Sequence, residues 1–84
     1  MDRTLQKREV EGNYDAFVRS LGRILEEHRG QFALMRNGKI VDYFDRPGAA
    51  NVAAQKKYPD GLYSIQEVTD EPIDLGFWSN VAAN

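Results

Sequence analysis

The sequence predicts an α+β domain with the element order helix, strand, strand, helix, strand. Three observations predict it: an apolar stripe at helical spacing from Tyr14 to His28, a two-residue turn at Asn37-Gly38, and a Pro-Asp-Gly turn at residues 59–61. With 84 residues, the chain is expected to form one small domain with a marginal core, which a partner or self-association would stabilise.

The first helix is predicted from Asn13, as its N-cap, to His28, with Gly30 just beyond its end. Residues 1–12 are mostly charged and lack an apolar face, so we expect a flexible charged arm or a loose extension of the helix. The single domain is then predicted to span residues 13–70. The stripe that predicts the helix consists of Tyr14, Phe17, Val18, Leu21, Ile24, Leu25 and His28.

The hairpin is predicted over residues 32–44, because Asn37 and Gly38 both tolerate the positive φ of a type I′ turn. Uninterrupted pairing would place Arg36 opposite Lys39, Met35 opposite Ile40, Leu34 opposite Val41 and Phe32 opposite Tyr43. Both faces of the hairpin carry apolar side chains. We therefore expect helices to cover one face and the C-terminal tail or a second copy of the chain to cover the other.

A short, alanine-rich helix is predicted next, with Asp45 as its N-cap and Pro47 in its first turn. Its small side chains suit close packing against a sheet. The third strand is predicted at residues 62–69. Tyr63 and Ile65 are expected on one side of this strand, with Leu62 and Val68 on the other.

The three strands are expected to form a mostly antiparallel sheet. A helical crossover returns the third strand in the direction of the second. It can pair antiparallel with the first strand (order 2-1-3) or parallel with the second (order 1-2-3). We favour 2-1-3 because antiparallel pairing is commoner.

Residues 71–84 are predicted to form an acidic and hydrophobic tail that is extended rather than helical. Ile73, Leu75 and Phe77 alternate with small or acidic residues, and Trp78 follows. Large apolar and aromatic side chains are frequent interface anchors, so Leu75, Phe77 and Trp78 are the predicted protein-binding residues. The tail can pack onto its own subunit or cross to a second one, and both alternatives are left open.

Charge is unevenly placed along the chain. Residues 31–58 carry five basic and two acidic side chains, whereas residues 59–84 carry five acidic side chains and no Lys or Arg. The alternative function is nucleic-acid binding by the basic hairpin tip and helix end, for which the candidate residues are Arg36, Lys39, Lys56 and Lys57. An isoelectric point of about 5.3 and the acidic C-terminal third argue against it.

Enzyme chemistry is not predicted. There is no cysteine, which excludes disulfides and thiolate chemistry, and the only histidine, His28, falls on the apolar stripe where a packing role is ordinary. Asp42 and Asp45 flank two aromatic residues, but a solvent position and a helix cap explain them. We expect no metal, no cofactor and no membrane partner, and the lack of a long apolar run favours a cytoplasmic location.

The segments FALMRNGKIVDYFD (residues 32–45) and YPDGLYSIQEVT (residues 58–69) resemble small uncharacterised bacterial domains that carry a hairpin-helix-strand unit. The resemblance covers about half of the chain. It implies the fold and a bacterial setting, and it carries over no functional residue. We therefore expect a non-catalytic protein-interaction module, for example a small antitoxin-like regulatory protein, which forms a homodimer or a complex with a protein partner.

Overall fold

The computed structural model describes residues 3–70 of the chain, in one α+β fold. Its elements are helix α1 (Arg3–His28), strands β1 (Phe32–Arg36) and β2 (Lys39–Phe44), helix α2 (Pro47–Lys57) and strand β3 (Ser64–Glu67). The strands form one antiparallel sheet in the order β2-β1-β3, so the predicted fold class and the favoured strand order are confirmed. The predicted tail, residues 71–84, lies outside the described residues.

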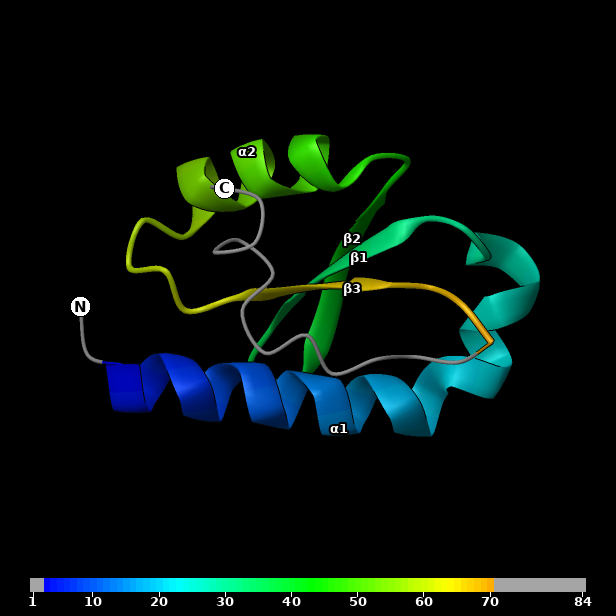
Figure 1. Ribbon diagram of the computed structural model, residues 1–84, viewed down its shortest axis with the longest axis horizontal. Helices are drawn as coiled ribbons and strands as arrows, with labels where there is room; N and C mark the ends of the chain where they lie inside the picture. The colour runs from blue at the N-terminus through cyan, green and yellow to red at the C-terminus, as the bar shows by residue number, and fades with distance from the viewer. Residues whose placement is uncertain (1–2, 71–84) are drawn as a thin grey trace.

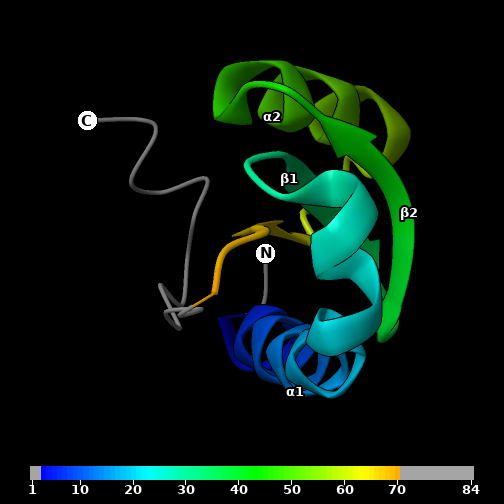
Figure 2. The same ribbon diagram turned by 90° about the vertical axis from the view of Figure 1, so that its right-hand side faces the viewer.

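The sheet lies between the two helices, with α1 against one face and α2 against the other (Figures 1 and 2). Three consecutive residues of the central strand, Ala33, Leu34 and Met35, are at most 1% exposed, because a helix covers each face of β1. The prediction that the tail or a second copy covers one face is therefore wrong for the central part of the sheet, where α2 does so.

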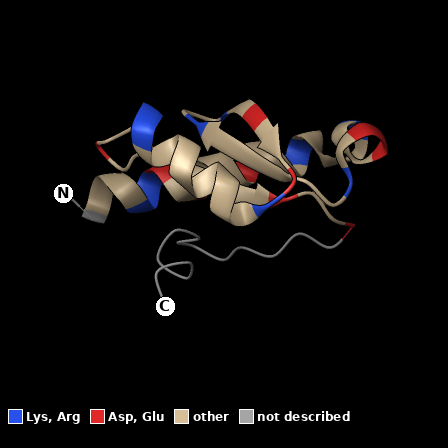
Figure 3. Cartoon of the chain, turned by 90° about the horizontal axis from the view of Figure 1, so that it is seen from above, with Lys and Arg blue, Asp and Glu red and all other residues tan. Residues whose placement is uncertain are grey.

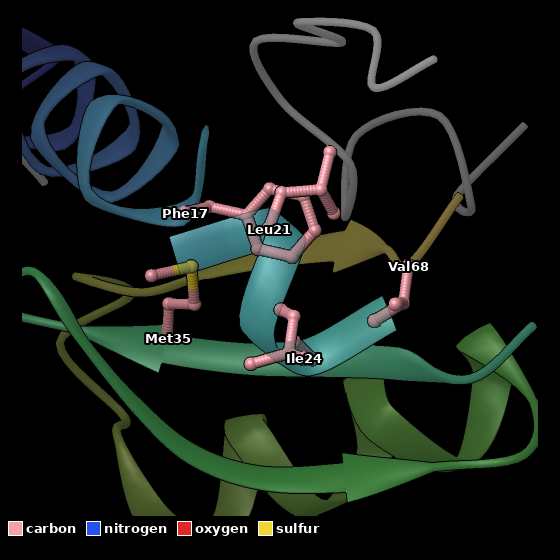
Figure 4. Close-up of a cluster of buried hydrophobic side chains, with 6 residues drawn as sticks. Phe17, Leu21, Ile24, Met35 and Val68 are labelled. Atoms are coloured by element: carbon pink, nitrogen blue, oxygen red, sulfur yellow. The ribbon is translucent and has the colours of Figure 1, made fainter. Parts of the chain in front are cut away.

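The larger apolar core lies between α1 and the sheet. Phe17, Leu21 and Ile24 project from the helix onto Met35 of β1 and Val68, which follows β3 (Figure 4). Phe17 and Val68 are fully buried. Each large side chain buried in this way stabilises the fold by roughly 1.5–3 kcal/mol, so this cluster holds α1 on the sheet.

The second core lies between α2 and the opposite face of the sheet. Ala50 and Ala54 have no exposed surface and pack on Leu34, Tyr63 and Ile65. Their methyl side chains let the helix backbone come close to the strands, as the alanine-rich sequence predicted. The prediction that Tyr63 and Ile65 share one side, with Val68 on the other, is confirmed.

A β-bulge changes the second half of the hairpin register. Arg36 opposes Lys39 and Met35 opposes Ile40, as predicted, but Leu34 then opposes Asp42, and Phe32 opposes Phe44. The predicted pairs Leu34–Val41 and Phe32–Tyr43 are therefore wrong, because β2 carries one extra residue at this point.

The physical reason for the bulge lies in the residues of β2. Strict alternation would place Asp42 on the same face as Ile40, which packs against the α1 core. With the extra residue, the carboxylate of Asp42 stays exposed, and Tyr43 joins Ile40 against α1. Phe44 then packs with Val41 on the α2 side.

Helix α1 begins at Arg3, ten residues before the predicted N-cap Asn13. Residues 3–12, predicted as an arm or a loose extension, form its first turns, and Val10 among them is buried. Asn13 is fully buried in the middle of the helix, so its assignment as N-cap is wrong. Asn and Asp are common caps, but here the amide has partners in the sheet.

Those partners form a contact that we call the turn lock, made by Glu9 and Asn13 of α1 with the hairpin turn. The Gly38 N–H donates to Asn13 Oδ1 (2.6 Å), and the Asn37 N–H donates to Glu9 Oε2 (2.7 Å). Asn13 Nδ2 donates to the Met35 carbonyl (3.3 Å) and to Glu9 Oε2 (3.1 Å). The lock satisfies turn amides that would otherwise need water.

The start of α2 also differs from the prediction. Arg46, in extended conformation, occupies the N-cap position without a side-chain cap, so the assignment of Asp45 as cap is wrong. Asp45 instead accepts a hydrogen bond from Gln31 Nε2 (3.0 Å). Pro47 stands in the first turn as predicted, and Gly30 beyond α1 has a φ of +86°, which favours glycine.

Candidate functional site

The predicted anchors Leu75, Phe77 and Trp78 lie outside the described residues. The described part of the chain nevertheless ends at a defined place. Val68 exchanges backbone hydrogen bonds with Gly30 and Gln31, and Asp70 is paired with Arg29, just beyond the last turn of α1. The segment that carries the anchors therefore starts beside the C-terminal end of α1.

One side of α1 next to this end is apolar and partly exposed. Val18 is 43% exposed, and Leu25, one heptad later, is only partly buried at the edge of the core. Residues seven apart lie on the same helix face, because seven steps of 100° amount to nearly two full turns. These two side chains form an apolar strip beside the buried Leu21.

The strip lies on the side of α1 away from β2. Glu9 accepts from the Asn37 N–H and Ala16 lies next to Gly38, so their side of the helix faces the turn from which β2 starts. Leu25 is 180° from Ala16 around the helix. The strip therefore lies on the side of α1 that is next to β3.

Strand β3 is an edge of the sheet within the described residues, as Figure 2 shows. The N–H and C=O of Val68 point toward Gln31 and Gly30, next to β1. Because backbone groups alternate along a strand, those of Glu67 and Ile65 point away from β1. We refer to Val18, Leu25 and this outer edge of β3 together as the α1–β3 surface.

Arg36, a candidate nucleic-acid residue, is used within the fold. Its guanidinium donates to both carboxylate oxygens of Asp60 (2.9 and 3.1 Å) and to the Leu62 carbonyl (2.9 Å), and it lies 4.6 Å from the Tyr58 ring centroid. The hydrogen bond from Arg36 lowers the pKa of Asp60, and the same bond raises the pKa of Arg36. This pair ties the hairpin tip to the loop before β3.

The three lysines of the alternative site are exposed. Lys39 opposes Arg36 in the hairpin register, and the Lys57 ammonium lies 5.9 Å from the same Tyr58 ring, with Lys56 preceding it. The structure thus brings Arg36 and Lys57 together around one aromatic ring. Asp60 neutralises the arginine there, and in the view of Figure 3 basic and acidic segments are interspersed rather than separated by sign.

His28 has the packing role that its place on the apolar stripe indicated. Its ring stacks on Tyr43 with centroids 3.5 Å apart and planes within 2°, and its Nδ1 lies 2.7 Å from Gln31 Oε1. Burial raises the pKa of Tyr43, with a smaller contribution from Glu27. This stack attaches the end of α1 to β2.

The apolar stripe that predicts α1 is not buried along its whole width, because Val18 is 43% exposed. A signal was present in the sequence. The stripe from Phe17 to Leu25 covers more of the helix circumference than one contact with a sheet buries, and Val18 and Leu25 stand at one margin of it.

Among residues 3–70, no cluster of three or more His, Cys, Asp or Glu side chains is arranged to hold a metal ion. In the same range, neither helix has the length and apolarity to cross a bilayer. Comparison of the chain with protein-family models, curated proteins and solved structures gave no match, so the resemblance to bacterial hairpin-helix-strand domains stays a prediction.

Proposed function

We propose that this chain is a non-catalytic protein-interaction module that binds a partner protein through its C-terminal segment, with Leu75, Phe77 and Trp78 as anchors. The observation that carries the proposal is the position of Asp70 just after the edge strand β3. Asp70, held by Arg29, leads directly from an edge strand into a segment rich in apolar and aromatic side chains. Edge strands and apolar segments of this kind are common elements of protein recognition.

The charge of this region favours a basic partner. Residues 59–84 carry five acidic side chains and no basic one, and Asp60 and Asp70 among them are paired with arginines. The remaining acidic side chains would speed the approach to a positively charged surface. A small regulatory protein of the bacterial cytosol that covers a basic site, as antitoxin-like inhibitors do, is one form that fits this charge.

The described residues support a binding role more than a catalytic one. Where a pKa departs from its ordinary value, a structural contact accounts for it: the Arg36–Asp60 pair holds the hairpin tip, and Tyr43 is half-buried under His28. The same pair weakens the nucleic-acid alternative, since a guanidinium bound to a carboxylate is a poor phosphate ligand.

The test is site-specific crosslinking in the native host, with a photoreactive residue in place of Trp78 in the full-length chain. We expect one protein partner to be captured, and the Leu75→Ala variant to reduce its capture by about tenfold or more, as for an interface anchor. The matched control is a photoreactive residue at Val52, an exposed apolar position on α2 (55%), which should not capture that partner.

Two results would contradict the proposal. One is equal capture of the same protein from positions 52 and 78. The other is tight binding of single- or double-stranded oligonucleotides that weakens steeply with salt and with Lys39→Ala or Lys57→Ala, which would favour the nucleic-acid alternative.

A further inference from the structure

We propose that, in the free protein, residues 72–78 dock on the α1–β3 surface of their own chain as a fourth strand beside β3. The anchors Leu75 and Phe77 then rest on Val18 and Leu25 until a partner takes them. This docking would give the proposed function a regulatory step, in which the segment leaves its own chain and binds the partner. The regulatory step rests on the proposed function. The docking itself concerns the free protein alone.

The starting point of the segment favours this placement. Val68 is buried in the core that Leu25 flanks, and Asp70 contacts Arg29. Residue 71 therefore begins beside the Leu25 end of the strip. Pro72 has no N–H to donate, which is tolerated at the first residue of a strand.

The length and pattern of the segment match the surface. Val18 and Leu25 are separated by about 10 Å along the helix at 1.5 Å per residue. From Ile73 to Phe77 an extended chain covers about 13 Å. Ile73, Leu75 and Phe77 would point to one face of that strand, so a single side of it would cover the strip.

The edge of β3 supplies backbone hydrogen-bonding groups for the segment. The outward N–H and C=O groups of Ile65 and Glu67 can pair with an antiparallel neighbour, and the chain from Val68 to Pro72 is long enough for the hairpin connection. An extended segment that alternates apolar and polar residues is suited both to this edge and to the strip.

The occupant is the segment of the same chain rather than that of a second copy. Only a few residues separate β3 from Ile73, and a tether that short gives an effective concentration on the order of millimolar. A second copy at micromolar concentration competes poorly with it.

The experiment uses the full-length chain with Phe77→Trp and Trp78→Phe together, which moves its only tryptophan to the strand face that would cover the strip. We expect the emission of this tryptophan to be blue-shifted from that of the urea-unfolded chain, and the amides of Ile65 and Glu67 to exchange slowly with solvent. Val18→Asp should shift the emission to the red and speed exchange of these two amides by about tenfold or more, while the Met35 amide stays protected.

The matched control is Val52→Asp on α2, which places the same charge at a similarly exposed apolar position and should change neither signal. Solvent-like emission of the tryptophan at position 77, or fast exchange of Ile65 and Glu67, would overturn the inference. So would signals that depend on protein concentration together with dimerisation, which would identify a second copy as the occupant. None of these results bears on the crosslinking at position 78, so the proposed function is tested separately.

Discussion

Asn13 is the buried polar residue whose side chain connects α1 to the hairpin. It is fully buried on α1, and its amide accepts from the Gly38 N–H and donates to the Met35 carbonyl. A buried amide is stabilising only when its hydrogen bonds are made, since each unpaired partner costs about 1–3 kcal/mol. The turn lock therefore requires at position 13 a side chain that both donates and accepts hydrogen bonds, as the amide of Asn does.

Asn13→Ala should lower the free energy of unfolding by about 1–3 kcal/mol, because it removes a buried side chain that accepts from the Gly38 N–H and donates to the Met35 carbonyl. Chemical denaturation measures this loss. The neighbouring change Gly12→Ala is the control. A Cβ at position 12 meets no described atom within 4 Å, so we expect it to stabilise the helix by about 0.5–1 kcal/mol. A loss below 0.5 kcal/mol for Asn13→Ala would argue against the turn lock.

The Arg36–Asp60 pair predicts a pH dependence. The pKa of Asp60 is lowered in the folded state, so the stability that the pair contributes is present above the ordinary carboxyl pKa of about 4 and is lost as the pH falls below it. Asp60→Asn should lower the melting temperature at pH 6, and this difference from the unmodified protein should shrink toward pH 3.

Thermal melts at several pH values measure the effect. In an Arg36→Ala background, Asp60→Asn should produce a smaller difference with a weaker pH dependence, because the guanidinium partner is absent and the Leu62 N–H remains as a donor to Asp60. A difference that persists unchanged at pH 3, or that is equal in both backgrounds, would show that the pair does not stabilise the fold.

At the scale of the elements, α2 depends on small side chains. Ala50 and Ala54 are fully buried against Leu34 and Ile65. Ala54→Leu should destabilise the protein by about 1–3 kcal/mol, because the larger side chain would push the helix from the sheet. Ala49→Leu, at an exposed position of the same helix, should change stability by less than about 0.5 kcal/mol. Equal effects of the two changes would contradict the close packing of α2.

The elements were largely predictable, and their boundaries and register were not. The Asn37-Gly38 turn, the apolar stripe and Pro47 act locally, so the sequence indicated the hairpin and both helices. The bulge depends on keeping Asp42 out of a core that α1 builds, which is a tertiary effect. The early start of α1 likewise follows from contacts of Glu9 and Asn13 with the turn, which helical periodicity does not encode.

The candidate site divides in the same way. The basic residues were found by their charge. No sequence pattern indicated that Asp60 pairs with Arg36, because the two are 24 positions apart and meet only through the fold. The exposed strip of Val18 could have been inferred from the width of the stripe. Its position beside β3 required the strand order.

At the scale of the whole molecule, the association state stays a prediction. The two helices cover the central part of both sheet faces, so an uncovered face is no longer an argument for a dimer. The edge of β3 and the exposed Val18 are still surfaces on which a second copy could bind. Deleting residues 72–84 should expose the α1–β3 surface and lower either the thermal stability or the oligomeric state. Sedimentation and thermal melts of both proteins measure this. A full-length monomer at high micromolar concentration with an equally stable truncation would contradict it.

The turn lock also restricts how the chain can change in length. A two-residue hairpin tip is ordinarily a site where a protein accepts an inserted loop or a tag. Here the Asn37 and Gly38 amides are held by Glu9 and Asn13, and the Gly38 backbone lies against Ala16. A longer tip would lose these partners and release the first half of α1. The hairpin tip is therefore a poor insertion point, and its length is set by a helix that precedes it in the chain.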